Sequence, residues 1–225
     1  LFTIFAKYRN FRLNINTEKS LHRFNQATDM EQNPDYSLLD KHIELLTKLA
    51  TVSNSGISVF DSHRKRHVFT SYNFSELFGY DMQRIETEDI EYFNLHIHPD
   101  DMIRLERNGK AVEEYFKLPG NTAELPRTKM INEYRILVGE RYIRVIEQYQ
   151  VLELFDNGEV WLSLSVLDVS PNQGPLETVH SKLMNCATGQ VYQLPEFTGE
   201  TRTAPLSQRE KKILQLVGEG LLSKE

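Results

Sequence analysis

Three consecutive stretches of alternating apolar and polar residues in the second half of the chain constrain its fold most strongly. They cover 129–138, 141–155 and 161–166, and an Asp-Asn-Gly sequence at 156–158 separates the last two. Alternation with a period of two is typical of β-strands, and Asp-Asn-Gly favours a tight hairpin turn. In the last stretch Leu162, Leu164 and Val166 alternate with Trp161, Ser163 and Ser165. The sequence therefore predicts an antiparallel sheet with one buried face and one face closer to water.

Upstream of these strands, a broad apolar stripe predicts a long helix over 36–52. Its members recur at helical spacing and are Leu38, Leu39, Ile43, Leu45, Leu46, Leu49 and Ala50. A stripe of this width is normally buried, so we expect the helix to pack on its own domain or against the same helix of a second copy. Residues 57–60 and 67–71 alternate on either side of a polar turn, and this pattern predicts a hairpin.

The segment between this hairpin and the three strands contains signals for helices. Residues 74–79 predict a short helix that ends at Gly79, and the acidic stretch 85–95 predicts another. Pro99 begins a longer helix, because proline suits the first helical position and the two aspartates that follow complement the helix dipole. After the last strand, residues 171–205 are interpreted as a linker that contains a short hairpin at 183–192, turning at 188–189.

The order of these elements over 56–170 resembles that of a PAS sensory domain. Three local motifs carry the resemblance, at Phe74 to Tyr80, at Ile97 to Asp101 and at Leu167 to Ser170. The resemblance implies an α+β fold, a PAS-like five-stranded antiparallel sheet with flanking helices. It also implies that residues 1–55 form an N-terminal arm and a flanking helix of the kind through which such domains often dimerise.

The end of the chain, 206–225, resembles the start of a LuxR-type helix-turn-helix. Ser207 and Glu210 form a capping-box pattern at the start of a short amphipathic helix. The positions that match the family pattern are Leu206, Ser207, Arg209, Glu210, Ile213, Leu214, Leu216, Gly220, Lys224 and Glu225; Ser223 replaces the usual Asn. The recognition helix would lie beyond this truncated segment, so base contacts are not assigned. The resemblance implies a parent protein that binds DNA and controls transcription, which this fragment would not do alone.

Composition excludes several classes of protein. The formal net charge is −6, so most of the chain is not expected to contact DNA directly. The single cysteine, Cys186, rules out a disulfide framework and a cysteine-rich metal site. No apolar run is long enough to span a membrane, and a cytoplasmic protein is expected. A glycine-rich phosphate loop and a nucleophile motif are both missing, so no enzymatic activity is predicted.

Candidate site residues are few. Tyr72, Phe78, Tyr134 and Trp161 could line an apolar ligand pocket, although core packing would explain any one of them. His96 and His98 could form a metal pair, but a helix-entry role for His98 is favoured. The sequence requires no cofactor: nothing singles out a haem histidine, and Cys186 lies outside the helical region where photoactive flavin domains carry their cysteine.

We therefore interpret the chain as the sensory and dimerising part of a cytoplasmic transcriptional regulator that acts as a homodimer. A small molecule or a partner would provide the signal. Two alternatives remain: a PAS module used only for dimerisation, and a fragment of a signalling enzyme. A roomy apolar cavity would favour ligand sensing, whereas a polar or overpacked interior would favour dimerisation alone.

Overall fold

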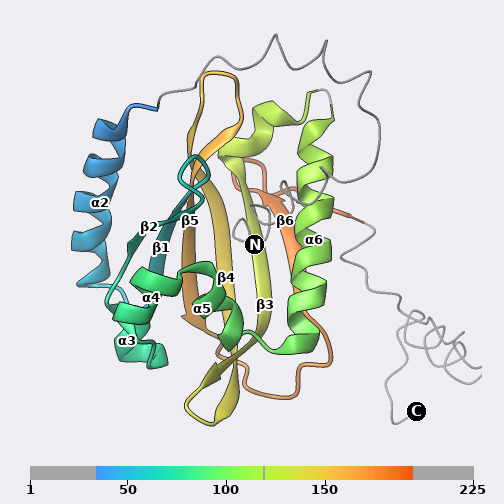
Figure 1. The fold of residues 1–225 in the computed structure, drawn as a ribbon. Coiled ribbons are helices and arrows are strands. Elements are labelled where there is room, and N and C mark those ends of the chain that lie inside the picture. The colour runs from blue at the N-terminus through green and yellow to red at the C-terminus, as the bar shows by residue number, and fades with distance from the viewer. Residues whose placement is uncertain (1–33, 119, 195–225) are drawn as a thin grey trace, which may run out of the picture.

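The computed structural model describes residues 34–118 and 120–194 (Figure 1). A seven-stranded antiparallel sheet, in the order β2-β1-β5-β4-β3-β6-β7, forms its centre. The strands are β1 (Gly56–Asp61), β2 (Arg66–Thr70), β3 (Thr128–Val138), β4 (Arg141–Leu154), β5 (Val160–Val169), β6 (His180–Asn185) and β7 (Val191–Tyr192). The helices are α2 (Tyr36–Ala50), α3 (Asn73–Phe78), α4 (Met82–Glu88), α5 (Ile90–His96), α6 (Pro99–Lys117) and the 3₁₀ helix η3 (Thr122–Arg127). The expected α+β fold and the expected order of its elements are confirmed.

Helices cover both faces of the sheet. α2 lies on one face, over a cluster that includes Leu39, Leu46, Val59 and Leu162 (Figure 1). α3, α5 and α6 contribute to a larger cluster with residues of β3, β4, β5 and β6 on the opposite face. The prediction that one face of the sheet lies closer to water is therefore wrong, because the short helices and α6 bury that face.

α2 begins where the sequence predicts, because Asp35 caps its N-terminus through a hydrogen bond from the Ser37 amide at 3.0 Å. Tyr36, in the first turn, meets the Trp161 ring edge-to-face at a centroid distance of 5.5 Å. The opposite side of the helix faces outward. Its large apolar side chains Leu45 and Leu49 are exposed, as is Val52 just after the helix.

The helical segment between β2 and β3 departs from the sequence prediction in one place. The acidic stretch forms two helices, α4 and α5, because Asp89 adopts φ 47° and interrupts the helix. Gly79 ends α3 in the left-handed region, at φ 71°, as its position predicts. His98 caps α6 through its side chain, which confirms its role as a helix-entry residue.

A buried ion pair fixes the start of α6 to the sheet. Asp101 accepts hydrogen bonds from the Arg135 amide, Nε and one terminal nitrogen at 2.8, 2.9 and 2.6 Å. One residue before the helix, the His98 amide donates to the Arg135 carbonyl at 3.0 Å. α6 is therefore attached to β3 by both backbone and side-chain contacts.

The sheet has two more strands than expected, because the hairpin expected at 183–192 is present but belongs to the sheet. β6 pairs with β3 over six residues, and β7 pairs with β6, so the hairpin expected within the linker extends the sheet from five strands to seven. Leu183 of β6 is buried beneath the larger cluster. The domain therefore continues past residue 170.

The connection from β5 to β6 is held against the sheet by polar contacts. Arg144 pairs with Glu133 at 2.7 Å and donates to the Gly174 carbonyl at 3.0 Å, while Ser170 donates to Glu133 at 2.7 Å. Burial alone would raise the pKa of Glu133, but the hydrogen bonds from Ser170 and Arg144 outweigh it and hold that pKa below its usual value. This connection is thus anchored to the middle of β3 and to the first part of β4.

Three sequence predictions concern residues outside the described ranges. The N-terminal arm over 1–33, the last part of the expected linker and the helix-turn-helix segment at 206–225 belong to these. Within 34–118 and 120–194, no helix is both long and apolar enough to cross a membrane.

Candidate functional site

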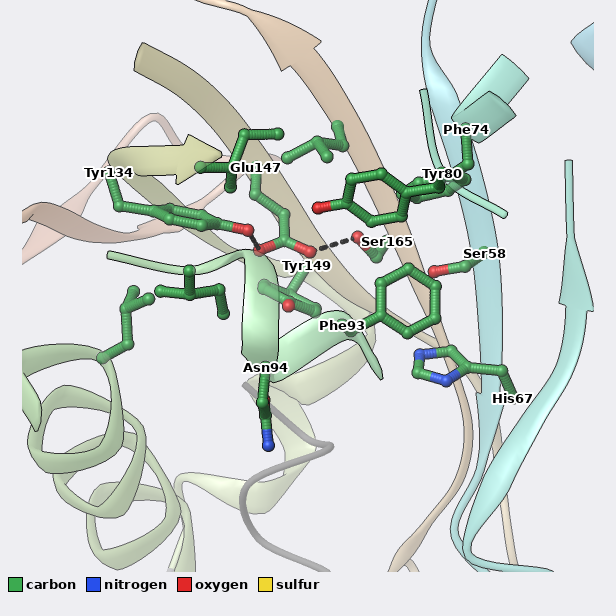
Figure 2. Close-up of a pocket in the computed structure, with 14 residues that line it drawn as sticks. Ser58, His67, Phe74, Tyr80, Phe93, Asn94, Tyr134, Glu147, Tyr149 and Ser165 are labelled. Carbon is green, nitrogen blue, oxygen red and sulfur yellow. Dashed lines mark hydrogen bonds between the residues drawn. The ribbon is translucent and has the colours of Figure 1, made fainter. Parts of the chain in front are cut away.

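A cavity of about 50 Å³ lies between the central strands of the sheet and the helices α3, α5 and α6. Helices and the loops beside them contribute apolar groups, among them Phe74, Tyr80 and Phe93. The strands contribute polar side chains, as Figure 2 shows: Ser58, Tyr134, Glu147, Tyr149 and Ser165. The cavity therefore has aromatic walls on its helical side and a polar floor on the sheet.

The Glu147 carboxylate is the centre of this polar floor. The Tyr134 hydroxyl donates a hydrogen bond to Oε2 at 2.6 Å, and the Ser165 hydroxyl donates to Oε1 at 2.6 Å (Figure 2). Removing a carboxylate from water costs several kcal/mol, and a hydrogen bond to a charged group contributes about 1.5–3 kcal/mol. The two hydroxyl groups therefore offset a large part of the cost of burying Glu147.

Strand register brings these groups together. Ser165 lies opposite Tyr149 on one side and opposite Ser58 on the other, so the three share one face of the sheet. Glu147 is two residues from Tyr149 and therefore points to the same face. Tyr134 on β3 lies opposite Val145 on β4, so its hydroxyl reaches diagonally to Glu147, two residues further along β4.

Burial and the Glu147 charge keep the cavity tyrosines protonated. Burial is the main cause that raises the pKa of Tyr134 well above its usual value, and the neighbouring charge of Glu147 adds to it. Burial, followed by the charge of Glu147, also raises the pKa of Tyr149 and the pKa of Tyr80. The phenols therefore remain hydrogen-bond donors over the physiological pH range.

The aromatic wall is continuous. Phe93 packs against Phe74 and Tyr80 with ring centroids 5.4 and 5.8 Å away, and His67 packs on Phe93 at 4.7 Å. The His67 Nδ1 lies 2.5 Å from Asp89, and its backbone amide donates to the same carboxylate at 3.0 Å. These contacts hold Asp89 at its positive φ and fix α5, which carries Phe93, beside β2.

The four residues expected to line a pocket are not brought together. Tyr134 lines the cavity, and Phe78 is buried in the same core cluster without being part of the cavity wall. Tyr72 is a correction: it precedes α3, and 63% of its surface is exposed. Trp161 is a second correction, because it packs under α2 on the opposite face of the sheet.

Sequence reasoning missed Glu147, although a signal was present. Ile143, Val145, Tyr149 and Val151 alternate along β4, and Glu147 occupies the middle of that inward-facing series. A charged residue at an inward position either has partners or serves a function. The same reasoning applies to Ser163 and Ser165, which are buried rather than wet.

His96 and Cys186, both weighed above as ligands of a metal or cofactor, lie outside the cavity wall. The His96 Nδ1 lies 2.9 Å from the Tyr92 carbonyl, and its ring packs on Tyr80 at 4.0 Å. Cys186 is exposed in the turn between β6 and β7. Among the residues that the structure describes, no group of three or more His, Cys, Asp or Glu side chains could hold a metal ion.

Comparisons with known proteins identify similar folds only. No family model matches the chain, and no curated protein matches it. Among solved structures, it is similar to the PAS domain of a Colwellia psychrerythraea protein, with 15% identity and a TM-score of 0.40, over 57% of this chain and 97% of that one. It is also similar to a sensory box histidine kinase/response regulator from Burkholderia thailandensis E264, with 18% identity and a TM-score of 0.37, over 54% of this chain and 82% of that one. The PAS domain of BvgS from Bordetella pertussis shows 13% identity and a TM-score of 0.37, over 59% of this chain and 89% of that one.

Proposed function

We propose that the protein senses a small molecule in the cavity above Glu147. The observation that carries this proposal is the convergence of hydroxyl groups from two strands, β3 and β5, on one buried carboxylate of β4, inside a wall of aromatic rings. A binding pocket combines apolar walls with a few well-placed polar groups, and this cavity has both.

The size and polarity of the cavity bear on the choice between sensing and dimerisation. It is smaller than the roomy apolar pocket expected of a sensor, and its floor is polar. A polar interior was expected to favour a module without ligand. Sensing is preferred here because the polar groups surround an open volume rather than filling it, so a ligand could use them.

We further propose that the sensed signal controls a DNA-binding domain. The support is the resemblance of 206–225 to the start of a LuxR-type helix-turn-helix, outside the described residues. A ligand that binds one packing of the sheet and its helices better than another shifts the balance between them. The contacts of Arg144 with Glu133 and Gly174 would pass such a shift to the connection that follows β5. Two DNA-binding domains would then change their spacing on an operator.

Fluorescence anisotropy with labelled duplex DNA, at low and at physiological salt, tests the link to transcription. The comparison is between this chain and a parent chain that includes a complete helix-turn-helix. We expect binding by the parent alone, with affinity that falls steeply as salt rises. If neither chain binds DNA, the proposed control of transcription is wrong, and a signalling role of another kind takes its place.

The outer side of α2 supports a second proposal, that two copies form a homodimer. Leu45 and Leu49 are spaced by four residues and Val52 follows three later, so they lie in one exposed stripe. A two-fold axis along such a stripe would bury it against itself. Sedimentation equilibrium of the wild type and of a Leu49→Glu variant tests this: we expect a dimer that the variant dissociates, and a monomeric wild type would contradict it. All three proposals describe a non-enzymatic role.

A further inference from the structure

The Glu147 cavity has a charge character that limits what it can hold. None of the described residues that line it is a lysine or an arginine. The hydrogen bonds from Tyr134 and Ser165 approach different oxygens, and a carboxylate has about four acceptor positions in all. Tyr149 is a third hydrogen-bond partner of Glu147, so about one acceptor position remains on a negatively charged group whose partners are neutral hydroxyls.

An anionic ligand would be repelled by this carboxylate, because charges interact more strongly away from water. A purely apolar ligand would displace water from Glu147 without replacing its hydrogen bonds, which costs affinity. A cation would do neither, since an ammonium group donates three hydrogen bonds and neutralises the buried charge.

The walls favour the same class of ligand. The rings of Phe74, Tyr80 and Phe93 lie together on the helical side of the cavity, opposite Glu147 (Figure 2). Aromatic faces carry partial negative charge and attract ammonium groups, and they also pack well against short alkyl chains. A carboxylate on one side and aromatic rings on the other suit a small organic cation.

The volume sets the size of that cation. A water-sized group needs about 10–15 Å³ of such space, so the cavity of about 50 Å³ holds about three to five non-hydrogen atoms. Resting on the proposed sensing function, we infer that the signal is a small primary amine, bound as its ammonium ion to Glu147 with its alkyl part against Tyr80 and Phe93. This names the ligand class for the cavity and excludes carboxylates and phosphates from it.

Isothermal titration calorimetry at neutral pH with three probes of matched size tests this inference. The probes are propylammonium chloride, propan-1-ol and sodium acetate. We expect propylammonium to bind at least about tenfold more tightly than propan-1-ol, a difference that one charge-assisted hydrogen bond supplies, and acetate to show no binding. Equal or tighter binding of the alcohol or of acetate would overturn the inference, as would the absence of binding by all three.

Two variants locate the binding. Glu147→Gln keeps the shape of the side chain and removes its charge, so we expect propylammonium to lose at least about tenfold in affinity while propan-1-ol changes little. The matched control is Glu153→Gln on the same strand, whose carboxylate pairs with His42 at 2.7 Å beside α2, outside the cavity. If Glu153→Gln weakens propylammonium as much as Glu147→Gln does, the ammonium is bound elsewhere.

A second variant keeps the inference open to refutation if Glu147→Gln fails to fold. Phe93 is only half-buried, so Phe93→Leu retains an apolar wall but removes an aromatic face. We expect it to weaken propylammonium by about 2- to 30-fold and to leave propan-1-ol nearly unchanged. An unchanged affinity for propylammonium would show that the aromatic rings do not contact the ligand and would contradict the inference.

Failure of this inference and failure of the proposed function give different results. If the parent chain binds DNA but none of the probes binds, the inference of an amine ligand is wrong while the proposed control of transcription stands. Amine binding that depends on Glu147, without DNA binding by the parent, would support the inference and reject control of transcription.

Discussion

The ion pair between Asp101 and Arg135 gives the sharpest test of how α6 is held over the cavity. Asp101 is 1% exposed and accepts three hydrogen bonds from Arg135, one of them from its backbone amide. Removing one partner of a buried pair costs about 3–5 kcal/mol, because the other is left without compensation. The Arg135 side chain is 23% exposed and can be partly rehydrated, so we expect the lower end, about 3 kcal/mol, for Asp101→Ala.

Urea denaturation followed by the fluorescence of Trp161 measures this change. Trp161 is the single tryptophan and is buried under α2, so its emission reports unfolding of the whole sheet. A loss of about 3 kcal/mol corresponds to about 6–12 °C in Tm for a domain of this size. The matched control is Asp100→Ala in the same turn, whose side chain is 83% exposed. It retains the Asp101–Arg135 pair and loses a helix-dipole interaction, which contributes about 0.3–1 kcal/mol, together with the 3.9 Å approach of its carboxylate to the His98 ring.

A double-mutant cycle with Arg135→Ala separates the pair from the loss of packing. We expect a coupling energy of about 1–3 kcal/mol between the two positions, as is found for residues in one hydrogen-bonded network. A coupling energy near zero, or equal effects of Asp100→Ala and Asp101→Ala, would show that the pair does not fix α6 and would refute this reasoning.

Three further predictions concern packing and pH. In Gly56→Ala the new Cβ would lie 2.9 Å from the Phe74 ring, so overpacking should lower the free energy of unfolding by about 1–3 kcal/mol; an unchanged urea midpoint would contradict this. Leu39→Ala should cost about 2–4 kcal/mol and shift Trp161 emission to the red, because it opens a cavity in the cluster that also contains Trp161. The pKa of Glu133 is lowered in the folded state, so its contribution is complete above the unfolded pKa of about 4.3 and is lost as pH falls below it. Stability of the wild type should therefore fall as the pH is lowered through and below about 4.3, with a smaller slope in Glu133→Gln, measured as urea midpoints.

Local pattern was enough to predict the elements but not their partners. The alternation over 129–138 and 141–155 and the stripe over 36–52 give the strands and α2 within a few residues, because each depends on its own periodicity. The pairing of β6 with β3 could not be read this way, since Leu183 faces Met130 only after the chain has crossed from β5. Hence local pattern alone assigns the two additional strands to a linker.

The candidate site shows the same limit at the level of single residues. Alternation alone places Trp161 on the face of Ser163 and Ser165. The register between β4 and β5 shifts near Glu153, however, and a bulge of this kind re-aims nearby side chains. Trp161 then meets Tyr36 under α2. By contrast, Glu147 could have been found, because an acidic residue in an inward-facing series is visible in the sequence itself.

The position of Glu147 is costly for folding, which is itself an argument for function. Even a buried ion pair can often be replaced by apolar residues of similar volume at no loss of stability or with a gain of about 1–4 kcal/mol, and Glu147 has no cationic partner among the groups that hydrogen-bond it. The strands around Glu147 could have been filled in this way, since Val145 and Leu167 beside it are buried and apolar. Instead, Tyr134 and Ser165 are arranged to hold a carboxylate at the edge of an open volume. A binding site requires polar groups that are held in place in the core even where they lower the stability of the fold. A domain used only for dimerisation has no such requirement.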